Sequence, residues 1–329
     1  MAASDGNGQA PTQPSAEVRA LWPDISGNAI NGLGEAEPGR PRPVFWRTDG
    51  STPHAPVMYY FYGRDKENPA ILDARKYRQR TAAIPVSEIA PKAAQRPAGE
   101  WTERVKAEAL RIGADDVGIT AWRADWAFAD RPRPRGEWAI VLAFRHAYPE
   151  LATAPDARAY IEVMRQYGRA GDTAKYLANW IRERGHFAAA KTGPMTEDVL
   201  MIPAAIAAGL GELGKHGSMI HKRFGANFRL AMVLTDVPLQ ADRPEVFGAD
   251  AFCTSCQICT RACPPDAIYP NKQLVRGEVK WYVDFDKCIP YFVDNQTCGI
   301  CLAVCPWSRP GLADNLLAKM ARRLGRANS

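Results

Sequence analysis

The chain of 329 residues is 46% hydrophobic and 24% charged, an ordinary globular composition that can support one large core or two moderate ones. It contains no run of about twenty apolar residues, so no membrane-spanning helix is predicted. The N-terminal stretch MAASDGNGQAPTQPSAEVRA shows neither a twin-arginine pair nor an apolar signal segment. We therefore predict a cytoplasmic protein, a setting in which disulfides are rare.

The net charge is +6, and basic residues cluster in the C-terminal segment 309–329 at Lys319, Arg322, Arg323 and Arg326. Such a cluster could mark a nucleic-acid surface, but no aromatic residue is interleaved with these charges. We therefore predict a solvated amphipathic helix and no nucleic-acid partner. The same positive surface would steer an acidic electron-donor protein toward the chain.

The first hundred residues read as two peripheral segments. Residues 1–56 are rich in Gly, Pro, Ser and Ala, which predicts either disorder or an extended arm lying on the body of the protein. Residues 57–100 are predicted to form a cover segment. The aromatic run at 59–62 (YYFY) favours a strand or covering element there, and the wall of a pocket is the alternative.

Between residues 101 and 249, helical and strand patterns alternate, which predicts a layered α/β (α+β) domain. A helix is expected from Trp101, with Val105, Ala109 and Leu110 on its buried face and Gly113 at its end. The near-continuous apolar run at 137–148 indicates a strand covered on both faces. The other expected elements are a strand from Val117, a helix over 172–185, an apolar helix over 202–214 and a strand over 228–239.

All eight cysteines lie between residues 253 and 305, so one kind of chemistry should account for them. The first group has the spacing C-x2-C-x2-C-x3-C-P, the bacterial ferredoxin run whose fourth cysteine serves the other cluster. In the second group the last three cysteines keep this spacing, and the first lies further upstream. Zinc would prefer two C-x2-C pairs and would leave the third cysteine of each run without a role.

We therefore predict two [4Fe–4S] clusters within a ferredoxin-like domain over residues 250–308. One cluster is assigned to Cys253, Cys256, Cys259 and Cys305. The other is assigned to Cys263, Cys288, Cys298 and Cys301. Eight thiols fill eight ligand positions with none left over. Such a domain conducts electrons, so the preceding part of the chain should hold a redox centre or dock a partner that does.

The segment 203-PAAIAAGLGELGKHGSMIHKRFGANFRLAMVLTDVPL-239 resembles the cobalamin-binding core shared by reductive dehalogenases and epoxyqueuosine reductases. The cysteine-rich segments FCTSCQICTRACPPDAI and WYVDFDKCIPYFVDNQTCGICLAVCPWS continue the resemblance, which covers about residues 100 to 310. It implies a nitroreductase-like cobalamin-binding core over 101–249, followed by a bacterial two-[4Fe–4S] domain. Glu212, Arg229 and the long-spaced second cysteine group favour the dehalogenase branch.

The resemblance also implies base-off cobalamin, because this family binds the cofactor without a lower histidine ligand. The five histidines, at 54, 146, 186, 216 and 221, show no metal-binding spacing. Glycine backbone can approach a ligand closely, and its N–H groups could hold a nucleotide phosphate; the alternative is helix-end and packing glycines. The candidate cofactor-binding residues are Gly209, Gly211, Glu212, Gly214, Lys215 and Gly217.

The stretch 165-RQYGRAGDTAKYLANWIRERG-185 offers two candidate proton donors. By resemblance, Tyr167 falls where dehalogenases keep their proton-donating tyrosine, and Asp172 falls where epoxyqueuosine reductases keep their acidic donor. The structural alternatives are a packing aromatic for Tyr167 and a helix N-cap for Asp172. Arg229 would favour the phenolate form of Tyr167 or hold an anionic substrate group, unless it is a surface arginine. Lys191 lies near another polar pocket position of the dehalogenases.

The function implied by the resemblance is reductive dehalogenation of an organohalide, with an aromatic or phenolic substrate favoured by the many aromatic residues. No flavin or nicotinamide module is readable, so a ferredoxin or flavodoxin is the expected electron donor. Two alternatives stay open. The first is an epoxyqueuosine-reductase-like enzyme acting on a non-halogenated substrate, with Asp172 as donor. The second is a non-catalytic electron-transfer or cobalamin protein.

Overall fold

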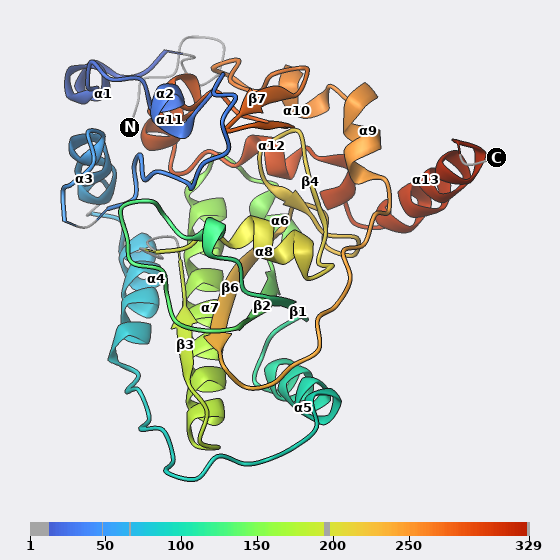
Figure 1. The fold of residues 1–329 in the computed structure, drawn as a ribbon. Coiled ribbons are helices and arrows are strands. Elements are labelled where there is room, and N and C mark those ends of the chain that lie inside the picture. The colour runs from blue at the N-terminus through green and yellow to red at the C-terminus, as the bar shows by residue number, and fades with distance from the viewer. Residues whose placement is uncertain (1–12, 48, 66, 194–197, 328–329) are drawn as a thin grey trace.

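A four-stranded antiparallel sheet forms the centre of the computed structural model, which describes residues 13–47, 49–65, 67–193 and 198–327 (Figure 1). Its strands, in the order in which they pair, are β1 (Asp116–Ala121), β2 (Trp138–Arg145), β6 (Phe228–Thr235) and β3 (Ala188–Lys191). The three predicted strands are confirmed. Strand β2 is buried along almost its whole length, as its apolar run predicts.

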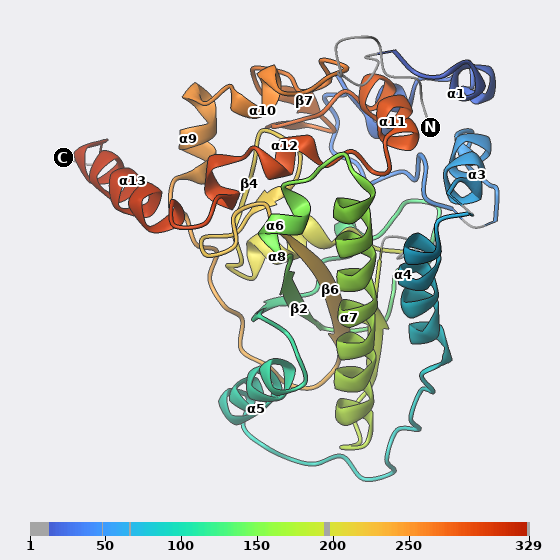
Figure 2. The same ribbon diagram turned by 180° about the vertical axis from the view of Figure 1, so that it is seen from behind.

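Helices cover both faces of this sheet (Figures 1 and 2). They are α5 (Ala98–Arg111), α7 (Ala157–Arg182) and α8 (Met201–Ala207), and a further helix, α4 (Pro69–Arg80), packs on α7. On one face, Leu142 of β2 belongs to the same core as Leu177 of α7. On the other face, Val141 belongs to the same core as Ala204 of α8. Figure 2 shows α4 lying alongside α7. Because successive side chains of a strand point to opposite faces, β2 contributes to both cores.

Helix α5 confirms the helix predicted from Trp101. Trp101, Val105 and Ala109 form a buried stripe at intervals of four residues, which places them on one face. The predicted terminating residue, Gly113, follows the helix with a positive φ of 122°. The prediction that Leu110 shares the buried face is wrong, because this residue lies one position beyond the stripe and is 48% exposed.

Helix α7 begins well before the helix predicted over 172–185. The side chain of Asp156 caps its N-terminus. The N-cap interpretation of Asp172 is therefore wrong, because Asp172 lies in the helix interior. Glycine in this stretch suggests a break, but it serves close packing instead. A Cβ atom on Gly171 would lie 2.5 Å from Cγ2 of Thr81, so the helix continues where only glycine allows its neighbour to approach.

The described part of the N-terminal arm lies on the body of the protein, where Val18 and Phe45 are buried. Of the two interpretations of residues 1–56, the extended arm therefore agrees with the structure, and residues 1–12 lie outside the described part. The arm contains the short helices α1 (Ala16–Leu21) and α2 (Gly27–Asn31). From α2 the chain returns across the body toward residues 42–46.

The aromatic run at 59–62 lies in helix α3 (Ala55–Gly63), so the strand interpretation is wrong. Val57, Met58 and Phe61 are buried with helical spacing, whereas Tyr59 between them is 51% exposed. A strand would have buried every second residue. The helix packs through these residues against α7 and the C-terminal part of the chain.

The predicted apolar helix over 202–214 is too long, because α8 ends at Ala207 and Gly209 follows with a φ of +76°. The chain then forms a two-stranded ribbon of β4 (Glu212–Leu213) and β5 (Met219–Ile220). Residues 214–218 connect these strands and are called the ribbon loop below. Two backbone hydrogen bonds close it, from Gly214 N–H to the Ser218 carbonyl and from Gly217 N–H to the Gly214 carbonyl.

The C-terminal part carries all the cysteines and lies at one end of the molecule, coloured orange to red in Figure 1. Its elements are α9 (Ala249–Ser255), α10 (Ile258–Arg261), β7 (Gln273–Val275), β8 (Glu278–Lys280), α11 (Phe285–Asp294), α12 (Ile300–Ala303) and α13 (Ala313–Ala327). Other short elements are α6 (Tyr148–Leu151) and the 3-10 turns Thr81–Ala83, Ala124–Trp126 and Pro306–Ser308.

Helix α13 projects from this end of the molecule in both views (Figures 1 and 2). Its Met320 is fully buried, whereas Lys319, Arg322 and Arg323 are exposed. The predicted amphipathic helix is therefore confirmed; the side chain of Arg326 lies outside the described residues. Within the described ranges, no helix has the length and apolar character needed to cross a membrane.

Candidate functional site

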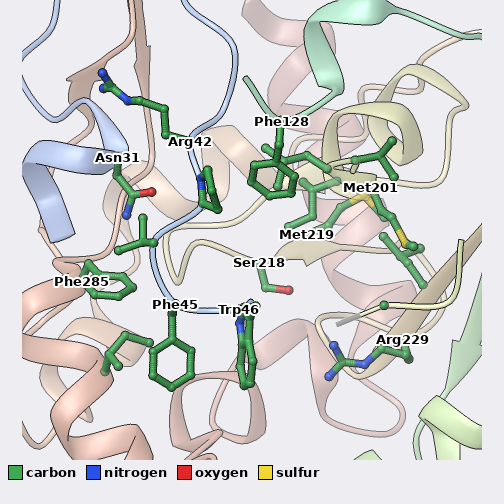
Figure 3. A pocket seen from close by; sticks show the side chains of 18 of the residues that line it. Asn31, Arg42, Phe45, Trp46, Phe128, Met201, Ser218, Met219, Arg229 and Phe285 are labelled. Carbon is green, nitrogen blue, oxygen red and sulfur yellow. The ribbon is translucent and has the colours of Figure 1, made fainter. Parts of the chain in front are cut away.

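A cavity of about 390 Å³ lies where the arm, α8, β6 and α11 meet. Aromatic and other apolar side chains form most of its wall. Figure 3 shows Phe45 and Trp46 from the arm, with Phe128 and Met219 across the cavity from them and Ser218 between. An apolar cavity with a few polar groups is the usual form of a small-molecule site.

Tyr167 and Arg229 meet at the wall of this cavity. Tyr167 is 8% exposed, and Arg229 Nη1 donates a hydrogen bond to its hydroxyl oxygen at 2.5 Å. The guanidinium carbon also lies 4.0 Å from the centre of the phenol ring. A guanidinium in this position stabilises negative charge on the phenolic oxygen. The fold thus brings together, from α7 and β6, the predicted proton donor and its predicted partner.

Asp172 and Lys191 are not among the residues that line the cavity. Oγ1 of Thr81 donates a hydrogen bond to Asp172 at 2.6 Å, in the contact between α7 and the turn after α4. Lys191, at the end of β3, forms an ion pair with Asp198. Both side chains therefore have partners of their own away from the Tyr167–Arg229 pair.

Four cysteines border a second cavity, of about 310 Å³. They are Cys263, Cys288, Cys298 and Cys301, the set that the sequence assigns to one cluster. Ile202 and Ser218 line both this cavity and the larger one. The two cavities are therefore neighbours, separated by α8 and the ribbon loop.

The other four thiols form a second group. Cys253 and Cys305 belong to one buried apolar cluster together with Trp281. Burial raises the pKa of the Cys305 thiol to about 12, and the neighbouring Cys253 and Cys259 raise it further. Cys256 likewise raises the pKa of the Cys253 thiol. The last cysteine of the second run thus lies with the first three of the first run, as the ferredoxin spacing predicts.

The thiols have the properties of ligands for a multinuclear centre. Burial raises the pKa of Cys288 to about 12 and that of Cys298 to about 11, so these thiols ionise only when a cationic centre replaces their protons. All eight cysteines are free of disulfides. In the part of the chain that the structure describes, no three His, Cys, Asp or Glu side chains converge closely enough to hold a single metal ion. Four thiols spread around a cavity fit a cluster.

Glu212, predicted to bind a cofactor, accepts hydrogen bonds within the protein. Its Oε2 accepts hydrogen bonds from the backbone N–H groups of Phe247 and Ala249 at 3.0 and 2.8 Å. These groups lie at the start of α9, where helices leave N–H groups without internal partners. Because α9 carries Cys253, Glu212 anchors part of the cysteine-rich segment to the ribbon.

Most of the glycines predicted to bind a cofactor serve close packing within the protein. A Cβ atom on Gly211 would lie 2.2 Å from the carbonyl oxygen of Ile220, and one on Gly214 would lie 2.6 Å from the ring of His216. Gly209 turns the chain after α8. Of the six predicted residues, Gly217 lines the cavity bordered by the four thiols, and the other five line neither cavity.

The sequence analysis missed the aromatic side of the larger cavity, which includes Phe45, Trp46 and Phe285. Adjacent large aromatics in a segment otherwise rich in Gly, Pro and Ser were the signal for the first two, because such residues rarely stay solvated. The aromatic run at 59–62, considered as a pocket wall, is absent from the lining.

Residues 252–308 match the 4Fe-4S dicluster domain family. Among curated proteins, the tetrachloroethene reductive dehalogenase of Desulfitobacterium hafniense is 30% identical over 226 residues, which cover 64% of this chain and 40% of that protein. The enzyme of the same name from Sulfurospirillum multivorans is 32% identical over 256 residues, covering 64% and 50%. Over 64% of its length, the chain is thus similar in sequence to reductive dehalogenases.

The chain is also similar to epoxyqueuosine reductases over a shorter stretch. An epoxyqueuosine reductase of Leadbetterella byssophila is 35% identical over 118 residues, which cover 30% of the chain and 34% of that protein. Two solved reductive dehalogenases share the fold. One is described with a mechanism for B12-dependent dehalogenation (TM-score 0.73, 22% identity, 95% of this chain and 50% of that one). The other is a catabolic enzyme in complex with 3-bromo-4-hydroxybenzoic acid (0.72, 23%, 89% and 47%).

The chain spans half or less of the length of the dehalogenases described above. The match to the solved structure with the B12-dependent mechanism is a match of fold and covers 95% of this chain.

Proposed function

We propose that this protein is a cobalamin-dependent reductive dehalogenase, an oxidoreductase that removes halide from an organohalide. One observation carries the proposal: the Tyr167–Arg229 pair lines a cavity that adjoins the cavity bordered by four cysteines. A proton donor and an electron source then border two adjoining cavities. Reduction of a carbon–halogen bond requires two electrons and one proton at the carbon.

In this proposal, two [4Fe–4S] clusters supply the electrons. The cluster beside the substrate cavity is held by Cys263, Cys288, Cys298 and Cys301. The other cluster, farther from the substrate cavity, is held by Cys253, Cys256, Cys259 and Cys305. The match of residues 252–308 to a dicluster family and the proximity of the thiols within each set support these assignments.

Cobalamin is the proposed cofactor of the larger cavity. The residues fit such a group in their apolar and aromatic character, and the cavity adjoins a cluster that could reduce it. When bound, a corrinoid would supply the low-valent metal that attacks the organohalide. Ser218, Met219 and Ile202 would contact it, because they lie on the wall nearest the four thiols. A corrinoid is larger than this cavity, so its binding requires the cavity to widen.

Tyr167 acts in this proposal as the proton donor to the substrate carbon. Its hydroxyl group would protonate the carbon, and Arg229 would stabilise the phenolate that is left behind. The apolar wall excludes water, which strengthens the interaction between phenolate and guanidinium. Asp172 does not line the cavity and is bonded to Thr81, so we assign the proton to Tyr167.

A halogenated aromatic compound, phenolic in type, is the proposed substrate. Phe45, Trp46 and Phe128 line the cavity and suit a flat ring, because aromatic pairs favour stacked or edge-to-face contact. Arg229 would in addition attract a phenolate or carboxylate group. One relative of the same fold was solved with a brominated hydroxybenzoic acid, which is a compound of this class.

A ferredoxin or flavodoxin is the proposed electron donor. The exposed basic residues of α13, Lys319, Arg322 and Arg323, lie on the helix that packs next to the buried cluster of Cys253 and Cys305. They would attract an acidic donor protein. The absence of a nucleic-acid partner and a cytoplasmic location stay predictions from the sequence.

Anaerobic reconstitution tests the proposed function. The purified chain is supplied with iron, sulfide and cobalamin, and halide release from a bromophenol is measured with reduced ferredoxin as electron source. We expect bound corrinoid, two clusters and halide release. Corrinoid binding without turnover of any organohalide would favour the non-catalytic alternative. Turnover of an epoxide that depends on Asp172 would favour the epoxyqueuosine-reductase-like alternative.

A further inference from the structure

Lys215, in the ribbon loop, is a fully buried lysine. Its exposed fraction is 0%, and its Nζ has no hydrogen-bond partner among the described residues. Burying an ammonium group without a partner costs several kcal/mol, so folded proteins pair such charges. The protein atoms described here provide no carboxylate for it. The position of Lys215 therefore calls for an anionic group that is not part of the polypeptide.

The surroundings of Lys215 identify where such a group would lie. Its Nζ lies 4.9 Å from the centre of the Trp281 ring, and Trp281 shares a buried cluster with Cys253 and Cys305. The backbone N–H of Lys215 donates a hydrogen bond to the sulfur of Cys253, which opposes the rise in the pKa of that thiol caused by burial. Main chain and side chain of Lys215 thus both lie next to the first group of thiols.

A second lysine on the same tryptophan provides a contrast. Lys272 Nζ lies 5.4 Å from the centre of the Trp281 ring, but it forms an ion pair with Asp250 at 2.8 Å. Asp250 also accepts a hydrogen bond from the indole N–H of Trp281 at 2.6 Å. Lys272 is partly exposed and has its countercharge within the protein. Lys215 lacks both.

The rest of the ribbon loop contacts the other group of thiols. His216, Gly217 and Ser218 line the cavity bordered by Cys263, Cys288, Cys298 and Cys301, whereas Lys215 is absent from its lining. The charge of Lys215 therefore acts unequally on the two proposed clusters. It lies close to the cluster on Cys253, Cys256, Cys259 and Cys305.

We propose that the buried ammonium group of Lys215 is the countercharge of the cluster held by Cys253, Cys256, Cys259 and Cys305, and that it raises the reduction potential of this cluster. A cubane with four thiolate ligands carries net negative charge, and reduction adds one more electron. A positive charge in a dry environment stabilises the reduced form more than the oxidised form, and local charge is a known determinant of cluster potential. Lys215 is then a positioning and tuning residue that does not touch the substrate.

Potentiometric titration of the anaerobic holoprotein, followed by EPR spectroscopy, tests this inference. Lys215→Met removes the charge but keeps a long side chain, Lys215→Gln is a second neutral variant, and Lys215→Arg keeps the charge. Lys272→Met is the matched control, because it removes a second lysine that lies against the same Trp281 ring. We expect both neutral variants to reduce the equilibrium constant for reduction of one cluster at least tenfold, a shift of about 59 mV for one electron.

Lys215→Arg should retain most of the parent potential, and Lys272→Met should change the equilibrium constant by less than threefold, because its charge is already paired and partly solvated. Equal shifts in Lys215→Met and Lys272→Met would overturn the proposal. Loss of iron from both neutral variants, with normal loading of Lys215→Arg, would still support a charge at the cluster. Loss of iron from all three Lys215 variants would assign the residue to folding and overturn the proposal.

This inference rests on the proposed function only in requiring the cluster. The potential is read without any organohalide, so the two ideas fail separately. A chain that binds no iron contradicts the proposed function. If the chain binds two clusters and substitution of Lys215 leaves both reduction potentials unchanged, only the proposed role of Lys215 is contradicted.

Discussion

Tyr160 and Tyr167 lie two turns apart on helix α7, and the hydroxyl oxygen of each accepts a hydrogen bond from an arginine side chain. Arg75 Nε donates to Tyr160 at 2.8 Å, and Arg229 Nη1 donates to Tyr167 at 2.5 Å. Each arginine also lies over the ring of its tyrosine. The cavity separates the pairs in function, because Tyr167 and Arg229 line it and the other two residues do not. The Tyr160–Arg75 pair is thus a control for the chemistry of the Tyr167–Arg229 pair.

Replacing Tyr167 should abolish most of the proposed activity. Tyr167→Phe removes the proton donor and is expected to lower the rate of halide release by about 10²- to 10⁴-fold, the usual contribution of general acid catalysis. Tyr160→Phe removes a hydroxyl group of the same kind and should leave this rate within about twofold. Both rates are measured on protein with equal iron and corrinoid content. Equal losses in the two variants would show that Tyr167 acts through packing.

Replacing Arg229 should reduce the rate of halide release less than replacing Tyr167 does. Arg229→Gln removes the charge that stabilises the phenolate, and a loss of about 10²-fold in kcat is expected from the effect of a single preorganised donor. Arg75→Gln should alter stability rather than kcat, because Arg75 does not line the cavity. Steady-state kinetics of the two variants measures the difference. Unchanged kcat in Arg229→Gln would remove the residue from the proton-transfer step.

Pairs of cysteine substitutions should reveal which thiols share a cluster. Cys253→Ala and Cys305→Ala are each expected to lose about half of the iron, since a cubane needs four thiolates. The double variant should lose no more than either single one, because both residues hold the same cluster. Cys253→Ala combined with Cys301→Ala should lose nearly all the iron. The opposite outcome is nearly complete loss of iron from the Cys253→Ala and Cys305→Ala double variant, with loss of only half from the Cys253→Ala and Cys301→Ala double variant. It would contradict the assignment of Cys305 to the same cluster as Cys253.

Replacing Glu212 should destabilise the cysteine-rich part. Glu212→Gln substitutes an amide for a buried carboxylate that accepts hydrogen bonds at the start of α9, and the expected cost is about 1–3 kcal/mol. Thermal unfolding should show a Tm lower by about 2–4 °C for each kcal/mol. Glu245→Gln, which affects an exposed ion pair with Lys222, is the control and should change Tm little.

Buried His146 should make the protein less stable in mild acid. Burial lowers the pKa of His146 from 6.5 to about 3, so between these values the unfolded chain binds a proton that the folded chain does not. The free energy of unfolding should therefore decrease as pH falls from 6.5 to 5.5, by about 1 kcal/mol for this group. Urea unfolding of His146→Leu should show a slope smaller by this amount. An unchanged slope would mean that His146 is already protonated in the folded state.

The elements that the sequence predicted well are those with a strong local pattern. The stripe Trp101, Val105 and Ala109 defines α5, and the apolar run of β2 defines a central strand. The cysteine spacing also predicted which thiols lie together, because ligand geometry limits the spacing. The pairing of Tyr167 with Arg229 came from resemblance to a family, since no local pattern joins residues 62 positions apart.

The features that the sequence did not predict depend on contacts between parts of the chain that are distant in sequence. The start of α7 was misplaced because Asp172 was interpreted as a helix N-cap, whereas the helix continues through Gly171, which packs closely against Thr81. The hydrogen bonds of Glu212 to the start of α9 were not predicted, because that helix comes to it from a distant part of the chain. The aromatic wall of the cavity depends on where the arm crosses the body, which composition alone does not specify.

The arm has a consequence for how specificity could change. Phe45 and Trp46 reach the cavity from a peripheral segment, whereas Tyr167 and Arg229 belong to a helix and a strand of the central scaffold. Residues 42–46 could therefore be exchanged for those of a related protein, so that the shape of the cavity changes while the proposed proton-delivering pair stays in place. Selectivity and reactivity would then evolve, or be engineered, as independent modules.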